Sequence, residues 1–214
     1  MKEEALQELE QQLAKCRECK LCEFAKGPVG WFGCAETPIV FVGEGPGGVE
    51  DDYGCPLIGP SGQLLDKALW ATKMTRDRVI TTNIVKCRPK GNRTPNIAEA
   101  DFCAQRWLEK ELEILQPKVI VALGSVALHY LGSPDMRITR ERGKWFKTRQ
   151  GYDCIATYHP AYLLRLADPH VLNHAKWEVF YDLEAARKKA EEAVPDYKFM
   201  SEEKTDLFKL FKKR

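Results

Sequence analysis

Eight cysteines in a chain of 214 residues are the side chains with the clearest capacity for chemistry. Cys16 and Cys19 form a C-x2-C pair, and Cys87 and Cys103 form a second pair with fifteen residues between them. Four thiolates from two such pairs can hold a zinc ion or a [4Fe–4S] cluster, and the spacing does not choose between them. Cys22 follows Cys19 at the same spacing, which leaves the first pair ambiguous. In the alternative interpretation, Cys87 and Cys103 are small buried apolar side chains. The remaining cysteines are expected to be structural: Cys34, Cys55 and Cys154.

A glycine-rich turn at residues 43–48 formally fits the G-x-G-x-x-G pattern of dinucleotide binding. We reject that function because the acidic residues at 50–52 follow at once and would repel a pyrophosphate. The helix that should begin at the third glycine is also expected to be interrupted soon afterwards. The turn instead predicts a tight loop, in which the backbone of Gly43 and Gly45 and the carboxylate of Glu44 approach a ligand.

The elements that must position these residues are apolar strands that alternate with helices along the chain. Ser61 is a plausible cap for the second helix, and Thr94 or Asn96 for the third. Strands that alternate with helices and lack a polar face are typical of a parallel sheet with helices on both faces, so the predicted fold class is α/β. The predicted strands are 38–43, 79–85, 118–124 and 153–158, and the main helices are 2–15, 61–69, 94–115, 125–131 and 171–193.

The polar candidates gather where the predicted strands end. Ligands of open parallel sheets bind at the carboxyl ends of the strands. Residues 43–47, 83–93 and 159–165 each follow a predicted strand. The sequence therefore predicts a single site at one edge of the sheet.

Composition narrows the class of protein without naming a partner. The chain is 44% hydrophobic and 30% charged, which excludes a disordered or collagen-like chain. Its formal net charge of +2 neither requires nor excludes nucleic acid. No secretory signal or membrane-spanning apolar run is found, so we expect a cytoplasmic protein without a membrane segment. We expect one domain over residues 1–194 and a charged, weakly attached tail over 195–214.

Five segments together resemble the family 4 uracil-DNA glycosylases, the thermostable iron–sulfur members of that group. Each motif is modest alone, but their order and spacing from Cys16 to Arg165 are specific. The segments are Cys16-x2-Cys19-x-Leu21; Gly43-Glu44-Gly45-Pro46-Gly47, continuing through Glu50, Asp51, Gly54, Pro56, Gly59 and Gly62 to Leu64-Leu65; Asn83-Ile84-Val85-Lys86-Cys87-Arg88-Pro89; Asn92-Arg93-Thr94-Pro95 leading to Cys103; and His159-Pro160-Ala161-Tyr162-Leu163-Leu164-Arg165.

The resemblance implies a three-layer αβα fold with a central four-stranded parallel sheet and a [4Fe–4S] cluster. The family's leucine follows the first cysteine pair by two positions, as Leu21 follows Cys19. The implied ligands are therefore Cys16, Cys19, Cys87 and Cys103, and Cys22 is spare. The cluster is expected to be structural and to pin the N-terminal segment and the loop after the second strand near the DNA.

The implied reaction is hydrolysis of the bond between uracil and deoxyribose in DNA, which leaves an abasic site during base excision repair. The base must first leave the helical stack and enter a pocket. Asn83 is expected to bind the uracil edge, and His159 to donate to uracil O2 as the bond breaks. The alternatives are an asparagine that merely ends a strand and a histidine packed before a proline turn.

Glu44 stands where the water-handling turn of this superfamily lies, and Gly45 stands where its best-known members carry an aspartate. Water is therefore expected to be held by Glu44 or by backbone groups, with Glu50 and Asp51 as lesser candidates. No lysine is placed as a Schiff-base nucleophile, which predicts a monofunctional enzyme. The loop at 88–95 has no histidine, so we reject covalent attachment to DNA through such a residue.

Contacts to DNA are expected from the segments that flank the site. Leu163, or Tyr162 beside it, is the candidate to enter the duplex where the base departs. The candidates to hold phosphates are Arg88, Arg93 and Arg165. The alternative for the basic loop, residues 88–95, is a solvated surface.

Leu57 departs from the resemblance, because the family usually has phenylalanine there and that ring stacks on uracil. Base–aromatic stacking is worth ~1–3 kcal/mol per base. We therefore expect weaker uracil binding, another deaminated base as substrate, or loss of activity. A DNA-binding module with little catalysis and a nucleotide-binding redox protein are the competing functions.

The C-terminal residues Asp206, Leu207 and Phe208 partly resemble a bacterial sliding-clamp-binding peptide, although its opening glutamine and leucine are absent. The alternative is a short helix that docks on its own domain. We otherwise expect a monomer that acts on single- or double-stranded DNA containing uracil.

Overall fold

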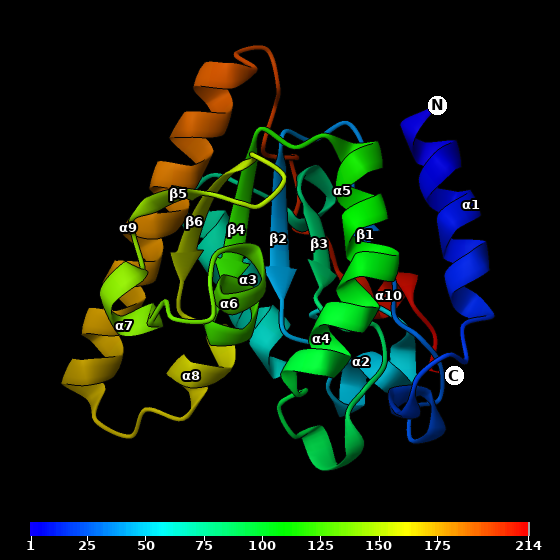
Figure 1. Cartoon of the computed structure of the whole chain (residues 1–214). Coiled ribbons are helices and arrows are strands. Elements are labelled where there is room, and N and C mark those ends of the chain that lie inside the picture. The colour runs from blue at the N-terminus through cyan, green and yellow to red at the C-terminus, as the bar shows by residue number, and fades with distance from the viewer. Residues whose placement is uncertain (214) are drawn as a thin grey trace.

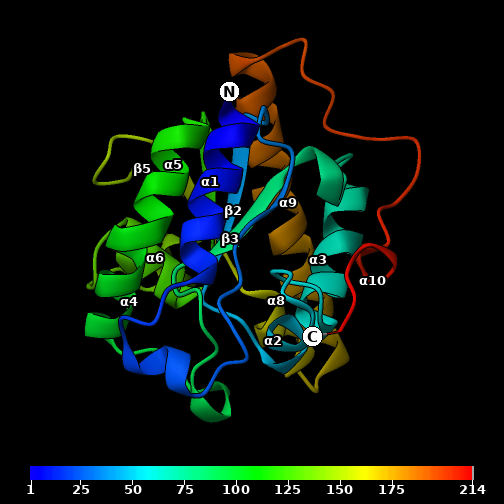
Figure 2. The same cartoon turned by 90° about the vertical axis from the view of Figure 1, so that its right-hand side faces the viewer.

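The computed structural model describes residues 1–213 and places a six-stranded sheet between two layers of helices (Figures 1 and 2). Among these residues, no helix is long and apolar enough to cross a membrane. The strands are β1 (Phe32–Gly33), β2 (Ile39–Gly43), β3 (Ile80–Asn83), β4 (Val119–Leu123), β5 (Trp145–Lys147) and β6 (Asp153–Thr157). The α-helices are α1 (Lys2–Ala14), α2 (Gly48–Tyr53), α3 (Pro60–Ala71), α4 (Ile97–Cys103), α5 (Glu109–Leu115), α6 (Ser125–Leu131), α7 (Ile138–Glu141), α8 (Pro160–Leu164), α9 (Pro169–Ala193) and α10 (Leu207–Leu210).

The strand order is β1-β3-β2-β4-β6-β5. The four middle strands are parallel and are the four that the sequence predicts, so the expected α/β fold and its parallel centre are confirmed. Two short antiparallel strands, β1 and β5, extend the sheet at its edges and were not predicted. They have two and three residues, too few to show an alternating pattern.

Successive side chains of the buried strands point alternately into two apolar cores, one on each face of the sheet, as the pleat of a strand requires. Val40, Val42 and Ala122 point into the core under α1, α4, α5 and α6. Phe41 and Val121 point into the core under α3, α8 and α9. Both faces of the sheet are thus covered, which explains why these strands read as continuous apolar runs.

A short helix, α2, begins at the third glycine of the turn and ends at Tyr53, where the sequence predicts an interruption; its cap is Gly54 with φ +71°. Two other helices differ from the sequence prediction. The cap of α3 is Gly59 rather than Ser61, with Pro60 in the first turn. The long helix after the basic loop is α4 and α5 joined by one π-helical turn at Ala104–Leu108, and its cap is Asn96.

The prediction of a weakly attached tail is wrong for residues 195–213. Phe199 and Leu207 are each only 4% exposed. The Phe199 carbonyl accepts from the backbone N–H of Thr75, and Leu207 packs with Cys55 and Ile58. This docking is not visible in the sequence because a few apolar residues among many charged ones give no periodic signal.

Candidate active site

The carboxyl ends of the four parallel strands bring the predicted site segments to one edge of the sheet. Gly43 at the end of β2 pairs in register with Asn83 at the end of β3. A Cβ on Gly43 would lie 2.4 Å from Asn83 Oδ1, so only glycine permits this approach. Across the sheet, a Cβ on Gly124 would lie 2.8 Å from the Cβ of His159. The two glycines thus make room for the two candidate side chains.

Asn83 is the clearest sign of a ligand site. Its side chain is 1% exposed, yet neither its amide nitrogen nor its amide oxygen has a hydrogen-bond partner. Leaving a buried polar group unpaired costs about 1–3 kcal/mol, and such groups are rare in native proteins. A ligand that accepts one hydrogen bond and donates another would relieve this cost. An asparagine that only ended a strand would not need to be isolated in this way.

His159 is held in one tautomer by the helix that it caps. Its Nδ1 accepts a hydrogen bond of 3.1 Å from the backbone N–H of Ala161 at the start of α8. Burial, with a smaller contribution from the positive charge of Arg165, lowers the pKa of His159 to about 4. The ring is therefore neutral near pH 7, and its proton lies on Nε2. A neutral imidazole with a free N–H is a hydrogen-bond donor that carries no charge of its own.

Glu44 links the basic loop to α8. Burial raises the pKa of its carboxyl group above the usual range, while a hydrogen bond with the Thr94 side chain and the charge of Arg165 oppose the rise. The carboxylate is half-buried in the segment that follows β2. Thr94 stands out in the sequence as a helix-cap candidate and as part of the motif at residues 92–95, and no local pattern indicates its contact with Glu44.

The lesser candidates to hold water, Glu50 and Asp51, are occupied elsewhere. Glu50 is 8% exposed, and its two carboxylate oxygens accept from the backbone N–H groups of Gly47 and Gly59 at 3.1 and 2.7 Å. Asp51 is 2% exposed and accepts from the backbone N–H of Lys26 at 2.8 Å. Both carboxylates therefore fix the loop around α2, and Glu44 is left as the candidate to hold water.

Leu57 lies in the loop that Glu50 fixes and is 5% exposed. Its φ of +53° is in the left-handed region, which only a constrained loop imposes on leucine. A Cβ on Gly62 would lie 1.5 Å from the carbonyl oxygen of Leu57, so the loop is pressed against the start of α3. The side chain belongs to the apolar core under α3, α8 and α9.

The candidates on α8 for contact with DNA differ in their exposure to solvent. Leu163 is only 4% exposed and packs in the core, so as the structure stands it is not available to enter a duplex. The next residue, Leu164, is 51% exposed and was not singled out from the sequence. Tyr162 is half-buried against Tyr158, with ring centroids 4.8 Å apart. Arg165 ends the helix and is exposed.

The two arginines of the basic loop are partly engaged. Arg88 lies across the start of α2, where a Cβ on Gly48 would be 3.3 Å from its guanidinium carbon, and its Nε donates to Asn92 at 2.7 Å. Arg93 forms a two-pronged ion pair with Glu99, at 2.7 and 2.6 Å. Arg93 would have to share or exchange this carboxylate to bind a phosphate.

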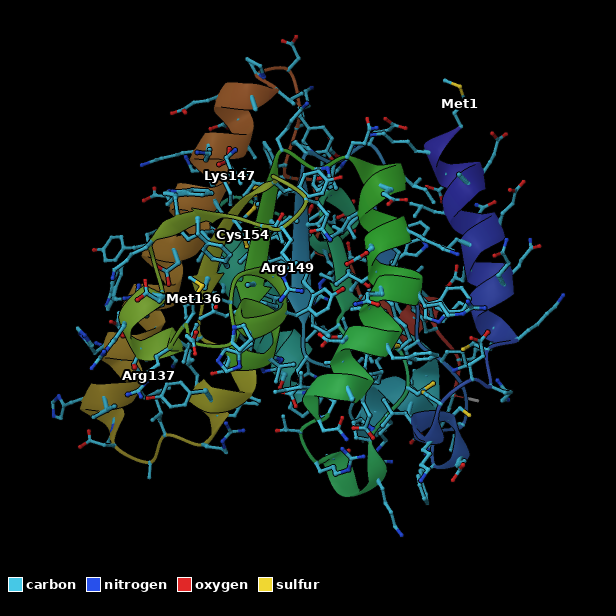
Figure 3. The ribbon with its side chains drawn as sticks, in the orientation of Figure 1. Met1, Met136, Arg137, Lys147, Arg149 and Cys154 are labelled. Carbon is cyan, nitrogen blue, oxygen red and sulfur yellow. The ribbon has the colours of Figure 1, made fainter. Side chains whose placement is uncertain are left out.

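The predicted cysteine ligands gather beside the basic loop. Cys87 and Cys103 are 5% and 6% exposed, and the half-buried Cys16, Cys19 and Cys22 pack against the same core. Burial raises the pKa of Cys87 to about 12, with smaller contributions from the nearby sulfurs of Cys103, Cys19, Cys16 and Cys22. Burial likewise raises the pKa of Cys103 to about 11. By contrast, Cys154 is buried on β6, across the width of the sheet from this group (Figure 3).

Comparison with known proteins agrees with this arrangement. A family model described as the uracil DNA glycosylase superfamily matches residues 31–184, and this is the class of protein that the fold and site define. A type-4 uracil-DNA glycosylase of Thermotoga maritima is 38% identical over 187 residues, which cover 87% of this chain and 95% of that protein. Another from Pyrobaculum aerophilum is 38% identical over 168 residues, 75% of this chain and 85% of that protein. A third, from Archaeoglobus fulgidus, is 36% identical over 168 residues, 75% of this chain and 84% of that protein. The chain belongs to the type-4 uracil-DNA glycosylase family.

Proposed function

We propose that this protein is a monofunctional DNA glycosylase that hydrolyses the bond between uracil and deoxyribose and leaves an abasic site. The observation that carries the proposal is the buried, unpartnered amide of Asn83 at the same sheet edge as the neutral His159. Uracil offers one N–H donor flanked by two carbonyl acceptors, so it can satisfy both side chains at once. Membership of the type-4 family supports the same activity.

Asn83 supplies base selection. Its carbonyl oxygen accepts from uracil N3–H, and its NH2 group donates to uracil O4. Cytosine has an acceptor at N3 and an amino group at C4, so it would place acceptor against acceptor and donor against donor. A buried site built around such a pair rejects the wrong base strongly, because its own polar groups stay unpaired.

His159 and Glu44 supply the chemistry. As the N1–C1′ bond breaks, its electron pair moves onto the uracil ring, and Nε2–H of His159 donates to the negative charge that develops on O2. The oxygen of a water molecule forms the new bond to C1′, and Glu44 orients that water and accepts its proton. The backbone of Gly43 and Gly45 completes the wall of the pocket. The exposed α8 residues Leu164 and Arg165 would occupy the gap in the duplex and hold a phosphate.

We further propose that Cys16, Cys19, Cys87 and Cys103 hold a [4Fe–4S] cluster. The donor set fits, because thiolates are the usual ligands of such clusters and the buried thiols crowd together at one place. Among the described residues, no three metal-binding side chains converge tightly enough for a single ion. Cys22 lies near the same sulfurs, and we leave it out because the family's leucine follows the first cysteine pair as Leu21 follows Cys19. When bound, the cluster would tie the N-terminal segment to the strand that carries Asn83.

Iron content and visible absorbance of the purified protein test the cluster. We expect about four irons per chain, lost in Cys87→Ala and retained in the matched variant Cys22→Ala. Retention in Cys16→Ala with loss in Cys22→Ala would contradict the ligand assignment. Colourless, iron-free protein that is fully folded would contradict the cluster itself.

Leu57 and the tail bear on substrate and partners. Leucine gives apolar contact without a flat π surface, so Leu57→Phe is expected to speed uracil release by about tenfold.

A sliding clamp could engage Asp206, Leu207 and Phe208 only if α10 left its place, because Leu207 is buried. Release of uracil from labelled oligonucleotides tests the main proposal directly.

A further inference from the structure

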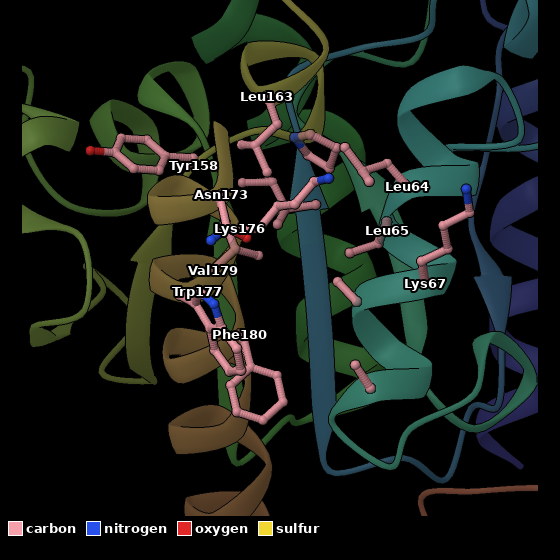
Figure 4. Close-up of a pocket in the computed structure, with 14 residues that line it drawn as sticks. Leu64, Leu65, Lys67, Tyr158, Leu163, Asn173, Lys176, Trp177, Val179 and Phe180 are labelled. Carbon is pink, nitrogen blue, oxygen red and sulfur yellow. The ribbon is translucent and has the colours of Figure 1, made fainter. Parts of the chain in front are cut away.

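A cavity of about 390 Å³ lies between α3, α8 and α9, on one face of the sheet (Figure 4). None of Glu44, Asn83 and His159 lines it, so it is separate from the site at the strand ends. Helix α8 stands between the two, since His159 caps this helix while Pro160 and Leu163 form part of the cavity wall. A volume of this size is within the usual range of small-ligand sites.

The mouth of the cavity carries an aromatic surface. Trp177 lines the cavity and is 52% exposed, an unusual exposure for so large an apolar side chain. Its ring stacks on Tyr181 at 5.9 Å and meets Phe180 edge-on at 5.6 Å, so the indole is braced by its neighbours on α9. A braced, half-exposed indole offers a rigid surface on which a flat ring can stack.

The polar groups around the cavity favour an anion with a hydrogen-bonding edge. No Asp or Glu lines it, whereas Lys67 and Lys176 do. Neither lysine forms an ion pair among residues 1–213. Figure 4 shows Lys176 reaching from α9 toward α3, while the ammonium of Lys67 turns to the outer side of α3. Asn173 adds an amide, one turn of α9 before Trp177.

We infer that this cavity is a second binding site, and that it takes a nucleotide. The aromatic base would enter the apolar cavity beside Trp177, Asn173 would meet the polar edge of the base, and Lys176 would pair with the phosphate. An aliphatic anion would use the lysine but would bring no flat ring to stack on the indole. The nucleotide has two possible sources, a free mononucleotide or an undamaged nucleotide of the bound DNA strand. The site requires no uracil and so stands independently of the proposed excision reaction.

Calorimetric titration of the full-length protein with dAMP, and with a single-stranded oligonucleotide that lacks uracil, tests this site. Ala68→Phe fills the cavity from α3, and Lys176→Gln removes its cation without disturbing the core. Lys188→Gln, an exposed lysine further along α9, is the matched control. Unfolding curves of all variants check that they are folded.

We expect dAMP affinity to fall about tenfold in Lys176→Gln, since a hydrogen bond to a charged group is lost, and to vanish in Ala68→Phe, with Lys188→Gln unchanged. If dAMP does not bind but both cavity variants weaken oligonucleotide binding, the nucleotide comes from the DNA strand. Equal affinity of Lys176→Gln and wild type for both probes would overturn the inference. So would loss of dAMP binding in Asn83→Leu alone, which would place dAMP in the uracil pocket.

Discussion

At the scale of single residues, the proposed function rests on a buried amide without a partner and on a histidine that stays neutral at pH values where it would be charged in water. His159 is neutral because burial and Arg165 lower its pKa to about 4. Asn83 is buried without a partner. The unpartnered amide weakens the folded state on its own and prepares it for a base, which is the usual conflict between stability and activity at a functional site. The lowered pKa of His159 weakens the folded state only below about pH 6.5.

The pKa of His159 predicts how stability depends on pH. The unfolded chain binds a proton on this residue near pH 6.5, whereas the folded protein binds it only near pH 4. Stability is therefore lost as the pH falls from 6.5 toward 4, because protons favour the unfolded chain in that window. Urea unfolding of wild type and His159→Asn at about pH 7.5 and about pH 5 measures this effect. The loss between the two pH values should be smaller in the variant, and an equal loss would refute the lowered pKa.

Replacing the amide of Asn83 by an apolar side chain should separate stability from function. We expect Asn83→Leu to raise the free energy of unfolding by about 1 kcal/mol, because two unpaired polar atoms leave the core. The same variant should lose uracil release altogether. Thermal unfolding and excision assays measure the two effects, and Asn83→Asp, which buries an unpaired charge, should destabilise instead. A destabilised Asn83→Leu would argue that the amide has a partner in the free protein.

At the scale of elements, the C-terminal helix α10 supports the loop that carries Leu57. Leu207 packs on Cys55 and Ile58, and Phe208 meets Tyr53 edge-on with ring centroids 5.2 Å apart. Without this packing, the loop that carries Leu57 would lose its contacts on the side that faces α10. The tail is therefore part of the framework of the site, although it lies far from it in the sequence.

Truncation of Leu207 tests that support. Leu207→Ala should lower the free energy of unfolding by about 2–3 kcal/mol, the range for a buried leucine, and should raise KM for uracil-containing DNA. The matched variant Leu210→Ala, which is 61% exposed, should change stability by less than about 0.5 kcal/mol. Urea unfolding and steady-state kinetics give both quantities. Equal effects of the two variants would show that the tail does not hold the loop.

Some elements of the fold could be predicted from the sequence, and others could not. Strands such as β2 and β4 were predictable because a wholly apolar run that ends in glycine has few other structures. The edge strand β1 and the docking of Leu207 depend on partners distant in sequence. The family resemblance singled out Asn83 and His159 as candidates, and their roles stay a prediction. The isolation of the Asn83 amide, the burial of Leu163 and the contact between Thr94 and Glu44 follow from packing, which no local pattern encodes.

At the scale of the whole molecule, a net charge of only +2 must still meet a polyanion. In the proposed complex, the charges that meet the phosphates are Arg88, Arg93 and Arg165, which lie near the same edge of the sheet as Asn83 and His159. Each phosphate contact to duplex DNA contributes a slope of about −0.9 to log affinity against log salt. We therefore expect this local cluster, and not the total charge, to set the affinity for DNA.

Salt titration of duplex binding tests this distribution. Arg165→Gln should reduce the magnitude of the salt slope by about one unit. Arg149→Gln removes an exposed arginine from the turn before β6, at the opposite end of the parallel strands, and should leave the slope unchanged. If Arg149→Gln has the larger effect, DNA binds on a different face from the one proposed.

The most direct measurement is cleavage, after alkali treatment, of labelled oligonucleotides that hold uracil opposite guanine, opposite adenine or in a single strand, with undamaged controls. We predict strand breaks only at uracil, with a rate that falls at least ~100-fold in His159→Ala because the donor to the departing base is gone. Binding to undamaged DNA should be unchanged in that variant. Absence of breaks at every uracil, by folded protein that still binds DNA, would contradict the proposed glycosylase.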